Sequence, residues 1–314
     1  MKEQRTRSLA IRWALILIWC SAARPAPAAD PEPDRDLKDL NVEVVKKWQK
    51  FAEKMLQQQN PRLALRAVEI IEAVDPLNKD VAKLREDPRI LLQAVRRHAV
   101  LLLSLDREKG VPKAKDLARD RSGTGNDGTI RGARFDLGVA GDCLTFEGAK
   151  DSVQSALASQ RFPQKDSPWT MCVWIKASTP GGSIFRLSGE DGTATLLSLL
   201  LGPEGQLVVD GGGRGKVSGK RSLCDGQWHH AAAVFSPGGA EPLEIYLDGE
   251  KDASGPFQLS SKENGRLGWQ LGAAGSGPPL RGQIDEVGLF LRSLTAGEIQ
   301  ALYRLGKSGK SLGD

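Results

Sequence analysis

The chain has 314 residues, of which 35 are glycine and 17 are proline, whereas only 5% are aromatic. This length allows one large domain or two ordinary ones, and so many turn-forming residues favour a β-rich body. The net charge is +5, but four of these charges lie in residues 1–28, which hold Lys2, Arg5, Arg7, Arg12 and Arg24 against Glu3. The rest of the chain is nearly neutral, which excludes a strong basic field for nucleic acid or an anionic membrane.

Residues 1–28 are predicted to be a secretory signal peptide. A basic start is followed by the short apolar run WALILIW at 13–19, and Ala26-Pro27-Ala28 is a suitable cleavage site. The run is shorter than the ~20 residues of a spanning helix, so we expect export without a membrane span. The mature protein should be secreted or periplasmic. A lipid attached at Cys20 is the alternative, although Trp19 is a poor match to the small residue that such sites prefer.

After the cleavage site we expect a flexible linker at 29–36, because this stretch is charged and contains two prolines. A helical segment is predicted at 37–109. Apolar residues spaced three and four apart indicate an amphipathic helix from Leu37 and a second one from Pro61 to Val74. A third helix is expected at about 87–105, and it ends in a strongly apolar run.

Residues 64–78 resemble the second helix of a tetratricopeptide repeat with its Asp-Pro exit turn, over about one repeat. Such repeats bury their apolar faces by stacking, and a stable array needs at least about three. An isolated helical hairpin or three-helix unit is therefore the preferred interpretation of this segment.

From about residue 116 to residue 306 the pattern changes to short apolar runs between glycine-rich turns. The run at 169–176 is apolar on both sides, as is typical of a strand in the middle of a sheet. Many short strands without interleaved helices predict a mainly β sandwich of two antiparallel sheets. A capping box at Thr295 and Glu298 predicts a last helix, and residues 307–314 are left as a tail.

Three cysteines remain if Cys20 is removed: Cys143, Cys172 and Cys224. Their spacing matches no metal motif, and an odd number leaves at least one free thiol. Burial as three small apolar side chains is the simplest interpretation. One disulfide among them, formed in an oxidising compartment, is the alternative.

Six motifs in the β region occur in a recognisable order and spacing. They are DRSGTGNDGT at 120–129, Trp174 in a strand, DGQWHH at 225–230, YLDG at 246–249, GQIDEV at 282–287 and LTAGEI at 294–299. Together they resemble the laminin-G-like, concanavalin-A-like jelly-roll family. The resemblance implies a jelly roll of two antiparallel sheets. It also implies a family of lectins, carbohydrate-binding modules, adhesion modules and, in distant relatives, glycoside hydrolases.

Most motif residues are expected to build the fold. Trp228 is expected to be a core ring, because an aromatic residue that enters a buried strand contributes a large apolar area. His229 and His230 are adjacent on a strand and should point to opposite faces, so they cannot bind one ion together. Trp174, His230 and the turn Asp248-Gly249 are taken as fold markers.

The resemblance also implies one structural calcium ion, held in many family members between the first strand and the strand near the C-terminus. Asp120 and Asp285 match those positions in this chain. Calcium prefers oxygen ligands such as carboxylates and backbone carbonyls. The alternative is that Asp120 initiates a turn and Asp285 accepts hydrogen bonds from loop amides.

No catalytic residue is predicted. Hydrolases of this superfamily often carry the pattern Glu-x-Asp-x-x-Glu, but the best match here begins with Gln283 and ends with Gly288. Asp285 and Glu286 are adjacent and are expected to face opposite ways, whereas glycoside hydrolysis needs two cooperating carboxyl groups.

The leading hypothesis is an exported, non-catalytic recognition module that binds carbohydrate or an extracytoplasmic protein. Trp269 is the candidate exposed platform for a sugar ring, with a core position as the alternative. A structural or assembly protein of the cell envelope, which uses the helical segment for protein contacts, is the second hypothesis. A glycoside hydrolase is the third.

Overall fold

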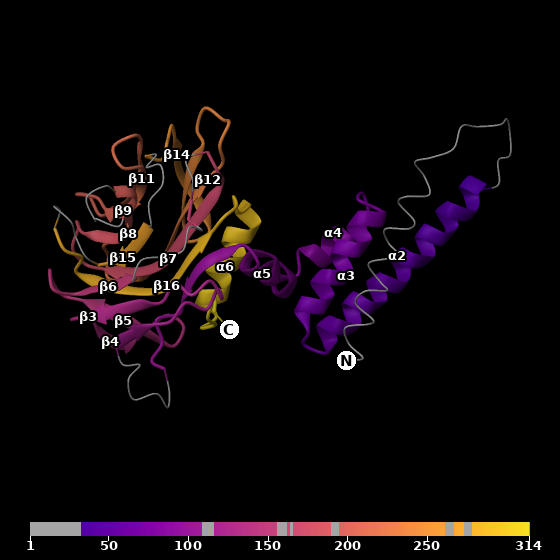
Figure 1. Cartoon of the computed structure of the whole chain (residues 1–314), viewed down its shortest axis with the longest axis horizontal. Coiled ribbons are helices and arrows are strands. Elements are labelled where there is room, and N and C mark those ends of the chain that lie inside the picture. Colours follow the sequence, from indigo (N-terminus) through magenta and orange to yellow (C-terminus); the bar gives the residue numbers. More distant parts are fainter. Residues whose placement is uncertain are drawn as a thin grey trace.

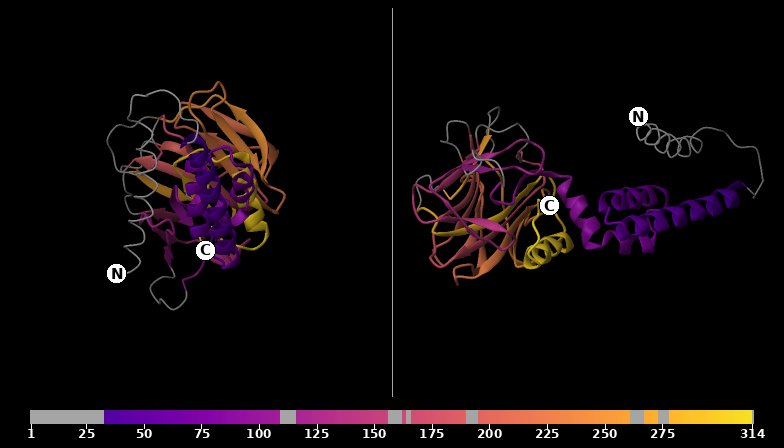
Figure 2. Two further views of the ribbon diagram at one scale, coloured as in Figure 1. Left: turned by 90° about the vertical axis from the view of Figure 1, so that its right-hand side faces the viewer. Right: turned by 90° about the horizontal axis from the view of Figure 1, so that it is seen from below.

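The computed structural model describes residues 33–108, 116–155, 162–163, 166–189, 195–260, 267–272 and 278–313. The expected signal peptide, the residue Cys20 and the first part of the expected linker lie outside these residues. Figure 1 shows two parts, an arm of helices and a sandwich of strands, and Figure 2 shows the arm projecting away from the sandwich.

The arm consists of α2 (Pro33–Gln57), α3 (Pro61–Val74), α4 (Lys79–Arg85) and α5 (Pro88–Arg96). Three of these helices begin at a proline, because the first helical position needs no N–H donor. The prediction for α3 was right at both ends. The expected linker was wrong at 33–36, since α2 already begins at Pro33. No helix among the described residues is long and apolar enough to cross a membrane.

The third expected helix, at 87–105, is wrong beyond Arg96. Residues Ala99–Leu103 form strand β1, which is buried throughout and pairs antiparallel with β16 (Gly282–Phe290). A continuous apolar run has no period that separates a helix from a strand, and pairing with β16 decides for the strand. The arm therefore ends near Arg96 rather than at 109, and the sandwich begins at Ala99 rather than at 116.

Two sheets of eight strands each form the sandwich, and all strand pairs are antiparallel. This confirms the predicted fold class. In the first sheet the order is β14-β13-β12-β7-β16-β5-β4, with β1 beside β16. Besides β1 and β16 its strands are β4 (Arg134–Leu137), β5 (Asp142–Phe146), β7 (Trp169–Ala177), β12 (Trp228–Phe235), β13 (Leu243–Leu247) and β14 (Glu250–Gly255).

The second sheet has the order β11-β10-β9-β8-β15-β6-β3-β2. Its strands are β2 (Leu117–Ala118), β3 (Gly128–Arg131), β6 (Ser152–Ser155), β8 (Ser183–Gly189), β9 (Thr195–Leu201), β10 (Gln206–Asp210), β11 (Lys216–Ser222) and β15 (Leu267–Leu271). Apolar side chains from the facing sides of both sheets fill the space between them and form the main core.

Part of the outer face of the first sheet is covered by helices. Cys172, Ala232 and Phe290 point outward from it and pack with Val95 of α5 and Leu302 of α6 (Ala296–Lys307). The predicted capping box begins α6, since Thr295 and Glu298 each accept a hydrogen bond from the other's backbone N–H. Among the residues that the structure describes, the helices cover one part of this face and leave another part open.

The expected C-terminal tail, 307–314, is not a free tail. Ser311 and Leu312 are buried, and Leu312 belongs to the cluster under α6. The guanidinium of Arg96 donates to the carbonyl oxygens of Leu312 (2.7 Å) and Ser311 (3.2 Å). These bonds join the end of the arm to the end of the described chain.

All three cysteines are free thiols. Cys143 and Cys172 are buried, which confirms the simplest interpretation for these two, whereas Cys224 is half-buried. Burial raises the pKa of Cys143 and of Cys172 to about 12, so both thiols stay protonated at neutral pH.

Candidate functional site

A row of five side chains crosses the outer face of the first sheet, one from each of five neighbouring strands. Backbone register pairs each residue with the next, in the order Trp228, Lys176, Gln283, Thr145 and Arg134. Residues directly opposite each other in an antiparallel pair point to the same face, with Cβ atoms about 4.5–5.5 Å apart. We call these five residues the open row.

The direction of the row follows from the alternation of side chains along β7. Val173 and Ile175 lie in the core between the sheets, whereas Cys172 lies in the cluster beneath the helices. Lys176 has the same parity as Cys172 and therefore points outward. Trp228 on β12 and Gln283 on β16, which are paired with Lys176, point outward as well.

The cover that α6 provides stops just before the open row. Tyr303 of α6 stacks on Trp174 with ring centroids 5.7 Å apart, and its ring lies 6.3 Å from that of His230. Trp228 and Lys176 lie two residues further along the same strands. The prediction that Trp228 is a core ring is therefore wrong: it is only partly buried and belongs to none of the three hydrophobic clusters.

Hydrogen-bonding groups line the rest of the open row. The side-chain amide of Gln283 donates to Asp136 Oδ2 (3.0 Å) and to Thr145 Oγ1 (3.1 Å), which holds the amide in one orientation. Arg134 is paired with Glu147. The row thus combines a partly exposed aromatic ring with ordered polar groups, and such a combination can bind a ligand that has apolar and hydroxyl-bearing faces.

Trp269, the expected platform for a sugar, is fully buried, so that prediction is wrong and the core alternative holds. Its ring Nε1 donates to the carbonyl oxygen of Asn126 (3.1 Å). Gly128 leaves room for the ring, because a Cβ atom there would lie 2.4 Å from it. The alternation of Leu267, Trp269 and Leu271 along β15 is the sequence signal for this inward position.

Asp120 lies in the loop after β2, and its carboxylate is surrounded by donors. Oδ1 accepts from the backbone N–H groups of Leu102 (3.0 Å) and Ser122 (2.9 Å). Oδ2 accepts from the hydroxyls of Ser122 (2.8 Å) and Thr124 (2.9 Å) and from the N–H of Asn126 (3.0 Å). Burial opposes ionisation, but these hydrogen bonds together hold the pKa of Asp120 below its ordinary value.

Asp285 is also held by amides. Its Oδ2 accepts from the backbone N–H groups of Val139 (2.9 Å) and Ala140 (3.1 Å), and its Oδ1 from that of Glu286 (2.9 Å). Calcium needs 6–8 oxygen ligands, roughly, whose lone pairs face the ion. In the described parts of the chain, no three His, Cys, Asp or Glu side chains gather where they could hold a metal. Asp120 and Asp285, with their oxygens occupied by donors, do not fit a calcium ion.

Asp285 and Glu286 lie on the same face, so the expectation that they face opposite ways is wrong. Both Ile284 and Val287 belong to the core, which leaves the two carboxyl groups between them on the outer side. A bulge in β16 causes this, with Glu286 at φ 48°. Burial raises the pKa of Asp285 to about 7, and burial together with Asp285 raises that of Glu286 to about 9.

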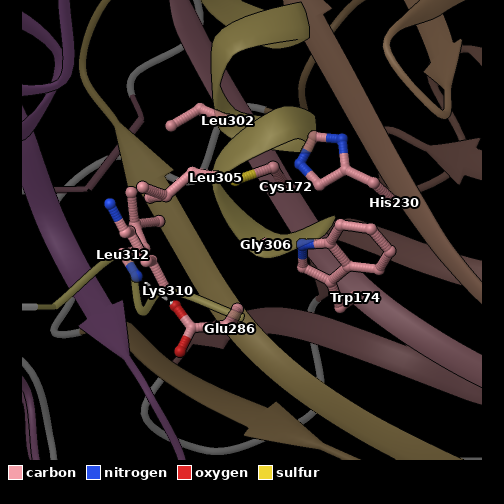
Figure 3. A pocket seen from close by; sticks show the side chains of 9 residues that line it. All are labelled: Cys172, Trp174, His230, Glu286, Leu302, Leu305, Gly306, Lys310 and Leu312. Carbon is pink, nitrogen blue, oxygen red and sulfur yellow. Dashed lines mark hydrogen bonds between the residues drawn. The ribbon is translucent and has the colours of Figure 1, made fainter. Parts of the chain in front are cut away.

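A small cavity lies beside Glu286, beneath α6 (Figure 3). Its volume of about 10 Å³ is the size of one water molecule and excludes a sugar. His230 borders it, and burial lowers the pKa of this histidine to about 4, so the ring is neutral. The carboxyl pair is 0% and 3% exposed for Asp285 and Glu286 respectively, so this enclosed site offers no entry to a substrate.

The structure separates the two adjacent histidines. His230 lies under α6, whereas His229 bridges two turns through Asp248 Oδ2 (2.8 Å) and Asp225 Oδ1 (3.0 Å). Asp248 and Gly249 have positive φ angles, 54° and 82°, as their predicted turn requires. His229 therefore fixes the turn that precedes Trp228.

These features define a two-sheet antiparallel jelly-roll sandwich with a helix on one outer face and an open row beside it. Residues 147–300 match a family described as the concanavalin A-like lectin/glucanases superfamily. The description names both sugar-binding lectins and sugar-cleaving glucanases. The match does not include the arm, where the tetratricopeptide resemblance stays a prediction. A search of curated proteins found no match.

Solved structures of a sialidase share the fold. Trypanosoma rangeli sialidase in complex with sialic acid is 15% identical with a TM-score of 0.52, over 68% of this chain and 34% of that chain. The same sialidase in complex with 2,3-difluoro-KDN is 16% identical with a TM-score of 0.53, over 77% of this chain and 41% of that chain. A third structure is domain 4 of AbnA, a GH43 extracellular arabinanase from Geobacillus stearothermophilus, in complex with arabinotriose. It is 17% identical with a TM-score of 0.48, over 65% of this chain and 98% of that chain. This chain therefore spans well under half of the sialidase chains.

Proposed function

We propose that the sandwich is a non-catalytic recognition domain that binds carbohydrate on the open row. The observation that carries the proposal is Trp228, a partly exposed residue on a part of the sheet face that no described helix covers, with Lys176 directly opposite it. A sugar ring would lie on Trp228 with its apolar face. Its hydroxyl groups would bond to Lys176, to the amide oxygen of Gln283 and to Thr145.

The extent of the open row supports a chain of sugars rather than a single one. Five strands about 4.8 Å apart give the row a length of roughly 19 Å. Every strand of the row except β12 contributes a polar group, and the amide of Gln283 is already oriented by Asp136 and Thr145. Such preorganisation reduces the entropy cost of binding.

The carboxyl groups of this region support binding rather than cleavage. Glycoside hydrolysis uses one carboxyl group as acid and a second as base or nucleophile across the sugar bond. Beside the open row, Asp136 accepts a hydrogen bond from Gln283, and Glu147 is paired with Arg134. Asp285 and Glu286 are buried beneath other parts of the chain.

The test is glycan binding by the mature chain, first on an array and then by titration calorimetry. Trp228→Ala should weaken binding at least about tenfold, as loss of a central aromatic contact does. Trp48→Ala, which removes a tryptophan from the arm, is the matched control and should bind like the wild type. Equal binding by the Trp228→Ala protein would exclude the open row as the site.

Export completes the proposal, since the predicted signal peptide would deliver the domain to glycans outside the cytoplasm. Expression of the full chain in its host should yield a protein that begins near residue 29 in an extracytoplasmic fraction. N-terminal sequencing checks this. A cytoplasmic protein that retains residues 1–28 would contradict it.

Apolar side chains on the arm favour a second candidate function, protein contacts within a cell-envelope assembly. Leu77 is 89% exposed, Leu63 is 42% exposed and Phe51 is 36% exposed. The full chain with Leu63→Ser and Leu77→Ser should then lose a partner that the wild type retains in cross-linking. Unchanged cross-links would remove this function.

A further inference from the structure

Lys176 has an unusual environment for a lysine. It lies on the central strand β7, it is half-buried, and its cross-strand neighbours are Trp228 and Gln283. Within the described part of the chain its ammonium group has no hydrogen-bond or ion-pair partner and no cation–π contact with Trp228. Lysine is seldom buried without a partner, because desolvation of an unpaired charge is costly.

The two carboxylates beside the open row have partners other than Lys176. Asp136 accepts the hydrogen bond from the Gln283 amide at 3.0 Å, and Glu147 is paired with Arg134 at the far end of the open row. The one positive charge of the row that lacks a partner within the described residues therefore lies next to its one aromatic ring. An anionic group on a ligand would complete this arrangement.

We infer that the open row binds an acidic saccharide, whose carboxylate or sulfate pairs with the ammonium of Lys176 while its ring lies on Trp228. This inference rests on the proposed carbohydrate-binding function. Cross-strand Cβ atoms about 4.5–5.5 Å apart place both side chains within reach of one sugar residue. The amide oxygen of Gln283, on the other side of Lys176, can accept a hydrogen bond from a hydroxyl of the same sugar.

The test compares three probes of equal length: an oligogalacturonate, the corresponding neutral galacto-oligosaccharide and a sulfated galacto-oligosaccharide that carries no carboxylate. The wild type should bind at least one acidic probe about tenfold more tightly than the neutral one at low salt, as a charge-assisted bond allows. This advantage should shrink as salt rises. The two acidic probes distinguish a carboxylate from a sulfate.

Substitutions at Lys176 separate the charge from the platform. Lys176→Gln should abolish the preference for the acidic probe, so that the variant binds the acidic and the neutral probe with similar affinity, whereas Lys176→Arg should retain the preference. Lys216→Gln, which removes an exposed lysine from β11 of the second sheet, is the matched control and should change nothing. Circular dichroism and a melting curve confirm that each variant is folded.

The outcomes distinguish the inference from the function on which it rests. If Trp228→Ala loses all binding but Lys176→Gln keeps the acidic preference, the acidic ligand is wrong and carbohydrate binding on the open row stands. If the wild type prefers the neutral probe, the inference is likewise overturned. If Trp228→Ala binds every probe like the wild type, both fail.

Discussion

Glu286 is buried in a bulge, where its backbone has a left-handed conformation. Its Oε2 accepts a hydrogen bond from the backbone N–H of Leu312, whereas its Oε1 has no hydrogen-bond partner among the described residues. Its pKa is raised from 4.5 to about 9, so the group is neutral at pH 7. Burial beside the apolar cluster under α6 disfavours the charged carboxylate, so the neutral acid is the form that fits this position.

The raised pKa makes stability depend on pH in a defined direction. The folded protein holds the proton of Glu286 more tightly than the unfolded chain, so its contribution to stability falls as pH rises from about 4.5 to about 9. This dependence of the free energy of unfolding on pH has a slope of up to about 1.4 kcal/mol per pH unit. Glu286→Gln replaces the neutral acid by an amide that does not titrate, so it should remove this slope.

Urea denaturation at pH 5, 7 and 8.5 measures the effect of Glu286→Gln on the free energy of unfolding. The free energy of unfolding of the variant should increase relative to that of the wild type as pH rises. Glu250→Gln, at an exposed position on β14, is the control and should be neutral. A difference that stays constant over this range would show that Glu286 does not titrate there.

Asp120 gives a prediction on metal removal. Its five hydrogen bonds are made by protein donors, so a chelator should leave the melting temperature unchanged, since only a ligand bound to the folded state raises it. Asp120→Ala leaves buried donors without a partner and should cost on the order of 3 kcal/mol, with or without calcium. A chelator-induced fall in melting temperature would contradict this account of Asp120.

At the scale of elements, α6 packs unusually closely on the first sheet. A Cβ atom on Gly306 would lie 2.4 Å from Nε1 of Trp174, whereas one on Gly297 of the same helix would have nothing nearer than 3.9 Å. The absence of a side chain at Gly306 thus sets the distance between helix and sheet.

Two alanine substitutions in α6 should therefore have opposite effects. Gly306→Ala should destabilise the protein by about 1–3 kcal/mol through overpacking. Gly297→Ala should be neutral or should stabilise by up to about 1 kcal/mol, because alanine favours helix. Thermal denaturation compares them. Equal effects would show that the contact with Trp174 does not limit the packing.

The elements differ in how much of them the sequence could predict. Local signals were sufficient for α3, with its proline start and Asp-Pro end, and for the capping box of α6. The run at 99–103 is apolar on every side, so its assignment depended on pairing with β16, where Ala99 faces Phe290 from the distant end of the chain. No local pattern contains that information.

The candidate site was predicted less well, for physical reasons. Trp228 was predicted to be buried and Trp269 to be exposed, whereas in the structure Trp228 is partly exposed and Trp269 is buried. For Trp228 the reason is that the sequence does not show where α6 stops covering the sheet. Alternation along β15 could have placed Trp269 inside. At the bulge that turns two adjacent carboxyl groups to one face, the positive φ angle belongs to Glu286 and not to a glycine, so the sequence gives no signal for it. The open row itself depends on register between five strands that are distant in sequence.

At the scale of the whole molecule, residues 311–313 connect the parts. Leu312 packs under α6, Arg96 of the arm donates to two carbonyl groups there, and Gly313 lies against Arg121. Removal of residues 311–314 should therefore loosen the arm against the sandwich. Small-angle scattering should show a wider distribution of sizes, while the sandwich itself keeps its near-ultraviolet spectrum.

The full chain with Arg96→Gln is the finer version of this experiment, since it removes the charged donor and leaves the C-terminal residues in place. It should loosen the arm less than the deletion does. An unchanged scattering profile for both proteins would show that other contacts of α5 and α6 are sufficient to hold the arm.

Helix α2 has 25 residues and is about 37 Å long, so it continues well past the end of the 14-residue α3. Its first residue is thereby placed far from the sheet that carries Trp228, whereas Leu312 is packed against that sheet. For surface-based binding measurements, this determines how the molecule should be attached. A biotin tag ahead of residue 33 leaves the open row accessible, while a tag after Leu312 would disturb the packing beneath α6.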